Sequence, residues 1–169
     1  QMAIGGTENP EIVYGFGVNL RWKDLDFGAM FQGIGRTWRI LSSNIMPASN
    51  KGSMYNIFDN YQDRWTVDNQ SQDVFYPRAD YGPNANNSQK STWWLRNMSF
   101  LRLKNLELGY SCPKKWLQGF VISNARVFVR GTNLLTFSKF NLWDPELATG
   151  DGAKYPAMKS VSVGFDITF

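Results

Sequence analysis

Residues 160–169 alternate with period two, and this pattern constrains the fold more than any other feature of the sequence. Every odd position from Val161 to Phe169 is apolar, whereas every even position from Ser160 to Thr168 is small or polar. Successive side chains of a β-strand point to opposite faces. The pattern therefore predicts a strand with one apolar and one polar face.

Four other stretches alternate in the same way. Two of them flank Lys23-Asp24 directly, which predicts a hairpin with a tight turn. In a third stretch the parity changes near Lys104 and Asn105, which indicates a β-bulge. Together the five stretches predict an all-β fold of about five antiparallel strands, at about 12–22, 25–35, 97–110, 123–134 and 157–169.

The connections between the predicted strands alternate in length. Lys23-Asp24 and residues 111–123 are short, whereas about 36–96 and about 135–156 are long. Outer-membrane barrels have short periplasmic turns and long outer loops. We therefore expect a membrane barrel with both long loops outside and Phe169 at the periplasmic end. A soluble β-sandwich is the alternative, but it gives no reason for this sorting.

The two faces of the predicted strands differ in chemistry. A charge that faces lipid at mid-depth costs ~2–4 kcal/mol, whereas a wet barrel interior tolerates it. We expect the apolar face to contact the lipid bilayer, with Val161, Val163, Phe165, Ile167 and Phe169 on the last strand. The arginines of the polar face are expected to pair with neighbouring strands or with a domain inside the barrel. The polar face includes Arg21, Asp26, Gln32, Arg102, Arg126, Arg130, Ser162 and Asp166.

Several classes of protein are disfavoured by what the sequence lacks. It has no apolar run near ~18 residues, so no transmembrane helix is expected. It contains no histidine, which removes the usual general base and the commonest zinc ligand. Its net charge of +4 is scattered, which disfavours nucleic acid as a partner. We expect no enzyme activity, no catalytic residue, no cofactor and no metal.

Five strands are too few to close a membrane barrel, since the smallest use ~8. We therefore expect residues 1–169 to be one segment of a larger barrel, with the other strands on a preceding polypeptide. The opening residues show no signal-peptide pattern, which agrees with this expectation. The free edge of the last strand should pair with the first strand of that barrel.

Four motifs occur in an order that resembles a known family. Residues 99–110 (SFLRLKNLELGY) are followed by a Pro-Lys turn at 113–117, by RVFVRGTNLLTF at 126–137 and by WDPE at 143–146. This order resembles the C-terminal portion of the SusC/RagA family of TonB-dependent outer-membrane transporters. Tyr14-Gly15-Phe16-Gly17, Arg64-Trp65-Thr66 and Tyr76-Pro77-Arg78 resemble earlier elements of the same family.

The resemblance implies a barrel of about 22 strands with an N-terminal plug, a TonB box and a SusD-like surface lipoprotein. Such a transporter imports oligosaccharides or peptides across the outer membrane of a Gram-negative, Bacteroidetes-like bacterium, with energy supplied through TonB. This chain contains neither plug nor TonB box, so it would contribute wall and extracellular loops. A passive porin or a structural or adhesive barrel is the alternative, and the substrate is not evident from the sequence.

Aromatic side chains supply the candidate contact residues. Trp65 and Tyr76 lie in the first long loop and are expected to contact ligand or the lipoprotein. Trp93 and Trp94 are expected in the interfacial aromatic girdle. Phe169 resembles the terminal aromatic that the barrel assembly machinery recognises, so its replacement should lower assembly.

The acidic residues of the second long loop have a structural interpretation and a functional one. Asp144 and Glu146, with Asp151, could supply oxygen ligands for Ca²⁺ or a pair of catalytic acids. Their spacing matches no calcium loop, and no partner acid stands elsewhere. A structural role in a turn is therefore expected.

Overall fold

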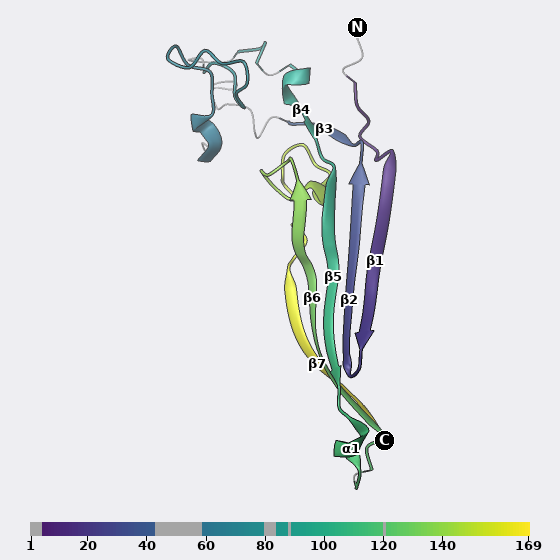
Figure 1. Cartoon of the computed structure of the whole chain (residues 1–169). Coiled ribbons are helices and arrows are strands. Elements are labelled where there is room, and N and C mark those ends of the chain that lie inside the picture. Colours follow the sequence, from purple (N-terminus) through teal and green to yellow (C-terminus); the bar gives the residue numbers. More distant parts are fainter. Residues whose placement is uncertain (1–4, 43–58, 80–83, 88, 120) are drawn as a thin grey trace.

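The computed structural model describes residues 5–42, 59–79, 84–87, 89–119 and 121–169. Its main element is one antiparallel sheet of five strands in the order β1-β2-β5-β6-β7 (Figure 1). The expected all-β fold of five antiparallel strands is confirmed. The strands are β1 (Ile12–Trp22), β2 (Leu25–Gly35), β5 (Phe100–Ser111), β6 (Asn124–Ser138) and β7 (Ser160–Thr168).

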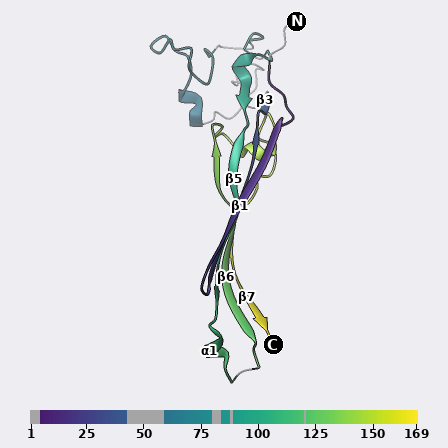
Figure 2. The same cartoon turned by 45° about the vertical axis from the view of Figure 1, so that its right-hand side comes forward.

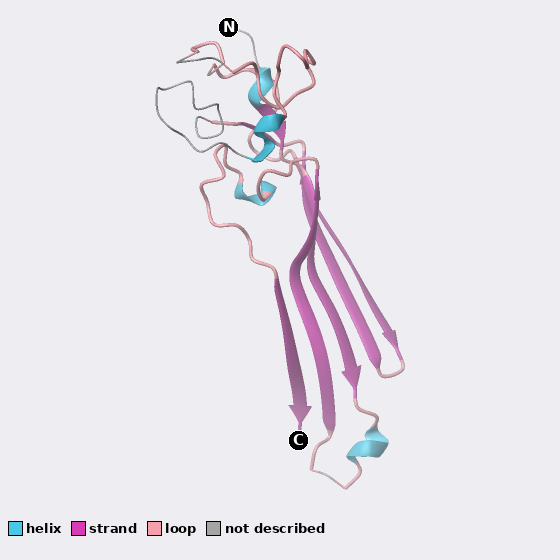
Figure 3. Ribbon diagram, turned by 90° about the vertical axis from the view of Figure 1, so that its left-hand side faces the viewer, coloured by secondary structure: helices cyan, strands magenta, loops and turns pink. Residues whose placement is uncertain are grey.

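The long and short connections lie at opposite ends of this sheet (Figures 1 and 3). The Lys23-Asp24 turn, the short helix α1 (Lys114–Leu117) and the C-terminal end of β7 lie at one end. The described parts of the long connections lie at the other end. In the tight turn Lys23 adopts a left-handed conformation with φ of 55°, which lets two residues join the strands. Loop lengths are therefore sorted by end, as expected for a barrel wall.

The sheet is long, twisted and one layer thick. Figure 2 shows β1 crossing the direction of β6 and β7, as the right-handed twist of adjacent strands requires. In the part of the chain that the structure describes, no second sheet or layer of helices covers the long strands. Among the described residues, no helix is both long and apolar enough to cross a membrane.

A β-bulge at Lys104 keeps the two faces of β5 consistent along its length. Met30 lies opposite Asn105 and Phe31 lies opposite Leu103, so Lys104 is an extra residue relative to β2. The side chains of Leu101 and Leu103 therefore share a face with Leu106 and Leu108 despite their opposite parity. The predicted bulge is confirmed.

Strand β6 continues four residues beyond its expected end. The pairing with β5 skips Asn133 and Leu134, and Leu135 then lies opposite Leu103. Asn133 has a left-handed φ of 53°, so the Thr-Asn-Leu stretch forms an irregularity inside the strand rather than its exit. The structure also starts β5 at Phe100 and β7 at Ser160, each three residues later than the sequence pattern suggested.

The first long connection carries secondary structure of its own. It contains two short paired strands, β3 (Trp38–Ile40) and β4 (Leu95–Asn97), and the 3-10 helices η2 (Asp59–Gln62) and η3 (Thr92–Trp94). Both β-strands were missed by sequence analysis because three residues are too few to show an alternating pattern.

Beneath them lies the loop cluster, a small hydrophobic core at this end of the molecule. Its buried members are Leu41, Tyr76, Trp94, Met98 and Phe140. Trp93 packs against the loop cluster and donates its indole N–H to the carbonyl oxygen of Phe75 at 3.1 Å. The expectation that Trp93 and Trp94 belong to an interfacial girdle was therefore wrong: they stabilise the loops.

Candidate functional site

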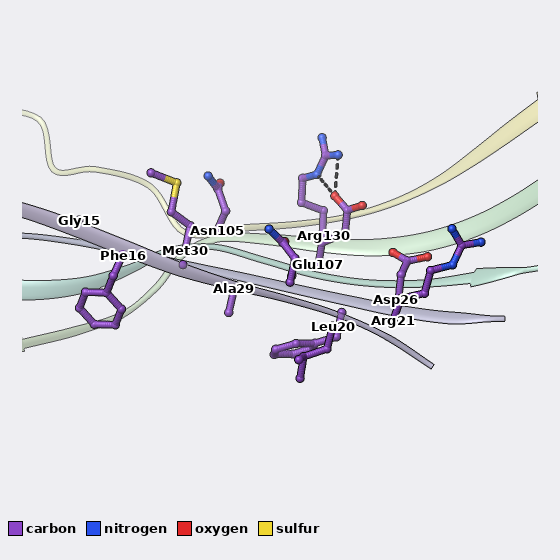
Figure 4. A pocket seen from close by; sticks show the side chains of 14 residues that line it. Gly15, Phe16, Leu20, Arg21, Asp26, Ala29, Met30, Asn105, Glu107 and Arg130 are labelled. Carbon is purple, nitrogen blue, oxygen red and sulfur yellow. Dashed lines mark hydrogen bonds and ion pairs between the residues drawn. The ribbon is translucent and has the colours of Figure 1, made fainter. Parts of the chain in front are cut away.

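The two faces of the sheet carry different side chains, as the alternation predicts. In Figure 4, Met30, Asn105, Glu107 and Arg130 project from one side of the sheet, whereas Phe16, Leu20 and Ala29 project from the other. The apolar face is largely uncovered, and its exposed members include Phe16, Val18, Leu20, Trp22, Leu108, Val129, Phe137, Val161, Val163, Phe165 and Ile167. An apolar surface of this extent needs a partner or a lipid phase to cover it.

The polar face is held together by an ion-pair network around Arg126 of β6. Its guanidinium donates to Asp26 of β2 at 2.5 and 2.9 Å, to Glu107 of β5 at 2.6 Å and to Asp166 of β7 at 3.2 Å. Glu107 also accepts from Arg130 at 2.6 Å. Four strands contribute to the network, so Arg126 and Arg130 pair with neighbouring strands as expected.

Two glycines provide the room that this network needs. Gly109 lies opposite Asp26, and a Cβ there would overlap both the Asp26 carboxylate and the Arg126 guanidinium. Gly164 leaves space for the ring of Phe128, which lies under two guanidiniums, Arg126 at 5.0 Å and Arg130 at 5.2 Å. The ring thus shields the ion pairs from one side and adds cation–π attraction.

Beside the network the polar face is hollowed (Figure 4). The hollow measures about 760 Å³. Gly15, Gly17 and Gly28 provide its floor because they carry no side chains, and Arg21 and Asn105 stand at its rim. It is an open recess in a wall, suited to packing against another element rather than to enclosing a reactant.

A second ion-pair cluster lies higher on the polar face, around Arg102 of β5. Arg102 lies opposite Gln32, which shares the face of Met30 and Asp26. Its side chain is only 2% exposed. The guanidinium donates to Asp144 and, at 2.7 Å, to Glu146.

Both carboxylates belong to residues 139–159, which we call the strap and which joins β6 to β7. Asp144 caps the 3-10 helix η4 (Pro145–Leu147) by accepting from the backbone N–H of Glu146 at 3.0 Å. The backbone N–H of Ser42 donates to the carbonyl oxygen of Gly150 at 2.9 Å. The strap therefore folds over the polar face and is fixed there at several points.

The acidic residues of the strap are thus engaged within the chain. Asp144 and Glu146 neutralise Arg102, and Asp151 accepts from the hydroxyl of Thr149, which holds the pKa of the Asp151 carboxyl below its usual range. In the described part of the chain, no group of three or more His, Cys, Asp or Glu side chains is placed to hold a metal ion. Asp144 and Glu146 therefore have the structural role that was expected, because they pair with Arg102 and Asp144 caps η4.

Trp65 and Tyr76, the candidate contact residues, lie near each other in the first long connection. The backbone N–H of Trp65 donates to the carbonyl oxygen of Tyr76 at 3.0 Å, and the Trp65 ring is half-buried with Arg78 over it at 5.8 Å. Tyr76 is 2% exposed, and its hydroxyl contacts the side chain of Asn60 at 3.3 Å. Burial raises the pKa of the Tyr76 hydroxyl.

Phe169 lies directly after β7 and is 82% exposed. Sequence analysis did not identify Arg102 as the anchor of the strap. The sequence contained a signal for this ion pair, because Arg102 stands between two leucines on a strand and Asp144 and Glu146 stand close together in the strap. The pairing was missed because it joins segments more than 40 residues apart.

The chain resembles known receptors over nearly its whole length. It is 31% identical to TonB-dependent receptor P26 of Formosa agariphila over 97% of this chain, and 27% identical to TonB-dependent receptor P3 of the same organism over 98%. It is 33% identical to TonB-dependent receptor SusC of Bacteroides thetaiotaomicron over 47% of this chain. It spans 17% of the length of each Formosa receptor and matches no protein-family model.

The solved structures agree with these relatives. The RagAB peptide transporter superposes on 98% of this chain with a TM-score of 0.76 and 34% identity. The RagAB peptide importer in its open-open state covers 95% of this chain with a TM-score of 0.73 and 35% identity. This chain covers 17–18% of those chains. The chain is therefore homologous to TonB-dependent receptors of the SusC/RagA family, and its strands have the arrangement found in their barrels.

Proposed function

We propose that residues 1–169 form part of the wall and the extracellular loops of a SusC-like TonB-dependent transporter, which imports oligosaccharides or peptides across the outer membrane. One observation carries the proposal: a single-layered sheet with an uncovered apolar face and an ion-paired polar face matches a peptide transporter over almost its whole length. The apolar face then contacts lipid and the polar face lines the lumen.

The dimensions of the apolar face support this placement. On β1 the apolar face runs from Ile12 to Trp22, and its aromatic side chains run from Tyr14 to Trp22, eight residues apart. This distance is about 27 Å along the strand. It is comparable with the apolar band of about 25 Å that outer-membrane barrels present to lipid. Aromatic side chains thus stand near both ends of the face, as in the interfacial girdles of such barrels.

The preceding part of the polypeptide completes the barrel and supplies the plug and the TonB box. The RagAB structures contain an importer built from more than this segment, and a SusD-like lipoprotein at the outer loops is the corresponding partner here. Trp65 belongs to the loop layer that would meet such a lipoprotein or its ligand. The bacterium is Gram-negative and of the Bacteroidetes type, as are the sources of the related receptors.

The experiment uses the full-length polypeptide in its own bacterium. Cells carrying either the intact gene or one without the TonB box are grown on oligosaccharides or on peptides as the limiting nutrient. Active import predicts that growth on one nutrient class is lost with the TonB box, while the amount of assembled barrel is unchanged. Uptake that is indifferent to the TonB box would instead establish the passive porin, and no uptake phenotype at all would favour an adhesive barrel.

A further inference from the structure

The end of the sheet that carries the short connections presents exposed tryptophan and lysine side chains together. Helix α1 lies beyond the ends of the strands (Figure 3). In it Trp116 is 67% exposed, and Lys114 and Lys115 are exposed beside it. A tryptophan this exposed in a helix of four residues contributes little to packing within the chain.

A belt of aromatic side chains on the apolar face lies at the same end of the sheet as this helix. Leu25 lies opposite Trp22 on one side and opposite Tyr110 on the other, so both aromatic rings stand at the same level of the sheet. Trp22 is 68% exposed, and the ammonium group of Lys23 lies 5.0 Å from its ring centre. Lysines therefore follow directly where the apolar face ends.

The charges of this connection are of one sign. Residues 112–123 contain Lys114 and Lys115 but no aspartate or glutamate. Tryptophan prefers the headgroup level of a bilayer, and lysines near a membrane surface attract anionic lipids. Along the sheet the apolar face is followed by the aromatic belt and then by the basic turn. A bilayer has the same order: acyl chains, then the interface, then the phosphate groups.

We propose that the turn formed by Lys114, Lys115 and Trp116, together with Lys23, binds anionic phospholipid headgroups of the leaflet at this end of the barrel. The inference rests on the proposed function, because it needs the apolar face to lie in a bilayer. The lysines pair with lipid phosphates and Trp116 lies at the level of the glycerol groups. The turn thereby fixes the depth of the wall in the membrane.

The test uses the full-length receptor in lipid nanodiscs of phosphatidylcholine with added phosphatidylglycerol, where one of the two lipids carries brominated acyl chains. Bromine quenches a tryptophan that it contacts. The difference in fluorescence between the wild type and Trp116→Phe gives the signal of Trp116. The difference between the wild type and Trp22→Phe gives the signal of Trp22. Brominated phosphatidylglycerol should quench Trp116 more than the mole fraction of phosphatidylglycerol in the bilayer predicts. Each lysine should enrich this lipid at Trp116 about fivefold at low salt.

Matched variants separate this proposal from the barrel assignment. Lys114→Gln/Lys115→Gln should remove the preference for phosphatidylglycerol, and Lys90→Gln/Lys139→Gln, with the same charge change at the opposite end, should retain it. A Trp116 quenched by neither lipid, or equally by both, overturns the headgroup site. A Trp22 quenched by neither lipid would overturn the barrel itself.

Discussion

Arg102 is the residue whose removal should most affect the loops. Its guanidinium is buried and neutralised by Asp144 and Glu146. Removing Arg102 leaves Asp144, whose side chain is 15% exposed, without its cation, whereas Glu146 keeps Lys104 at 3.3 Å; about 3–5 kcal/mol, the cost of breaking a fully buried pair, is therefore an upper limit. We expect Arg102→Met in the full-length receptor to release the strap, seen as faster hydrogen–deuterium exchange across 139–159.

Arg130→Met is the matched control for this experiment. Arg130 also pairs with a carboxylate on the polar face, but its side chain is half exposed. An exposed pair contributes about 0–1 kcal/mol, so strap exchange should stay at the wild-type rate. Equal exchange in the wild type and in Arg102→Met would show that the loop cluster alone holds the strap.

Tyr76 should make the loop cluster sensitive to alkaline pH. Burial raises the pKa of its hydroxyl above the ordinary value of 10.0, which it keeps in the unfolded loop. The stabilisation that the protonated Tyr76 hydroxyl gives the folded loop cluster is complete below the unfolded pKa of 10.0. It is lost as pH rises through the higher pKa of the folded state. Proteolysis of the 59–79 region should accelerate in that range, and Tyr76→Phe should reduce the acceleration. A pH profile unchanged in Tyr76→Phe would contradict this assignment.

At the scale of elements, the bulge in β5 decides which face Arg102 joins. Lys104 is the extra residue, so deleting it moves the part of β5 before the bulge by one position relative to β2. A one-residue slip exchanges the two faces of a strand. Arg102 would then face lipid, at a cost of ~2–4 kcal/mol, and its pairing with the strap would be lost.

We therefore expect deletion of Lys104 to lower the yield of folded barrel. The folded fraction is measured by the faster migration of the unheated receptor in detergent gel electrophoresis. Lys104→Gln keeps the number of residues and serves as the control, with a folded fraction near that of the wild type. A normal yield after deletion would mean that the strand absorbs the slip elsewhere.

The same elements show how far sequence alone predicts this structure. Alternation identified all five long strands and the bulge at Lys104, because period two is a local property of a half-buried strand. It misplaced the end of β6, where Asn133 interrupts the pairing without ending the strand. It also missed the pairing of Arg102 with the strap and the role of Trp94 in the loop cluster, since both depend on contacts between distant segments.

At the scale of the whole molecule, the ion-paired polar face links the strands of the wall to the loops. The ion-paired polar face can line a wet lumen because its charges are neutralised across four strands, from Asp26 to Asp166. The strap adds structure on that same face and so narrows the space above the polar wall, whereas the described part of the first long connection extends beyond the ends of the strands (Figure 1). In a complete transporter this arrangement would leave passage of solute to the parts that the strap does not cover.

Assembly of the whole barrel provides the last prediction, which concerns Phe169. It follows β7 on the apolar face and is 82% exposed, so truncating it removes little packing within this chain. We expect Phe169→Asp in the full-length receptor to reduce assembled barrel in the outer membrane several-fold, because a charge replaces the aromatic that the assembly machinery would recognise. Val121→Asp, an equally exposed position in the connection before β6, should leave the yield near normal. Quantitative immunoblotting of outer-membrane fractions decides the matter, and normal insertion of Phe169→Asp would show that Phe169 is one more lipid-facing side chain.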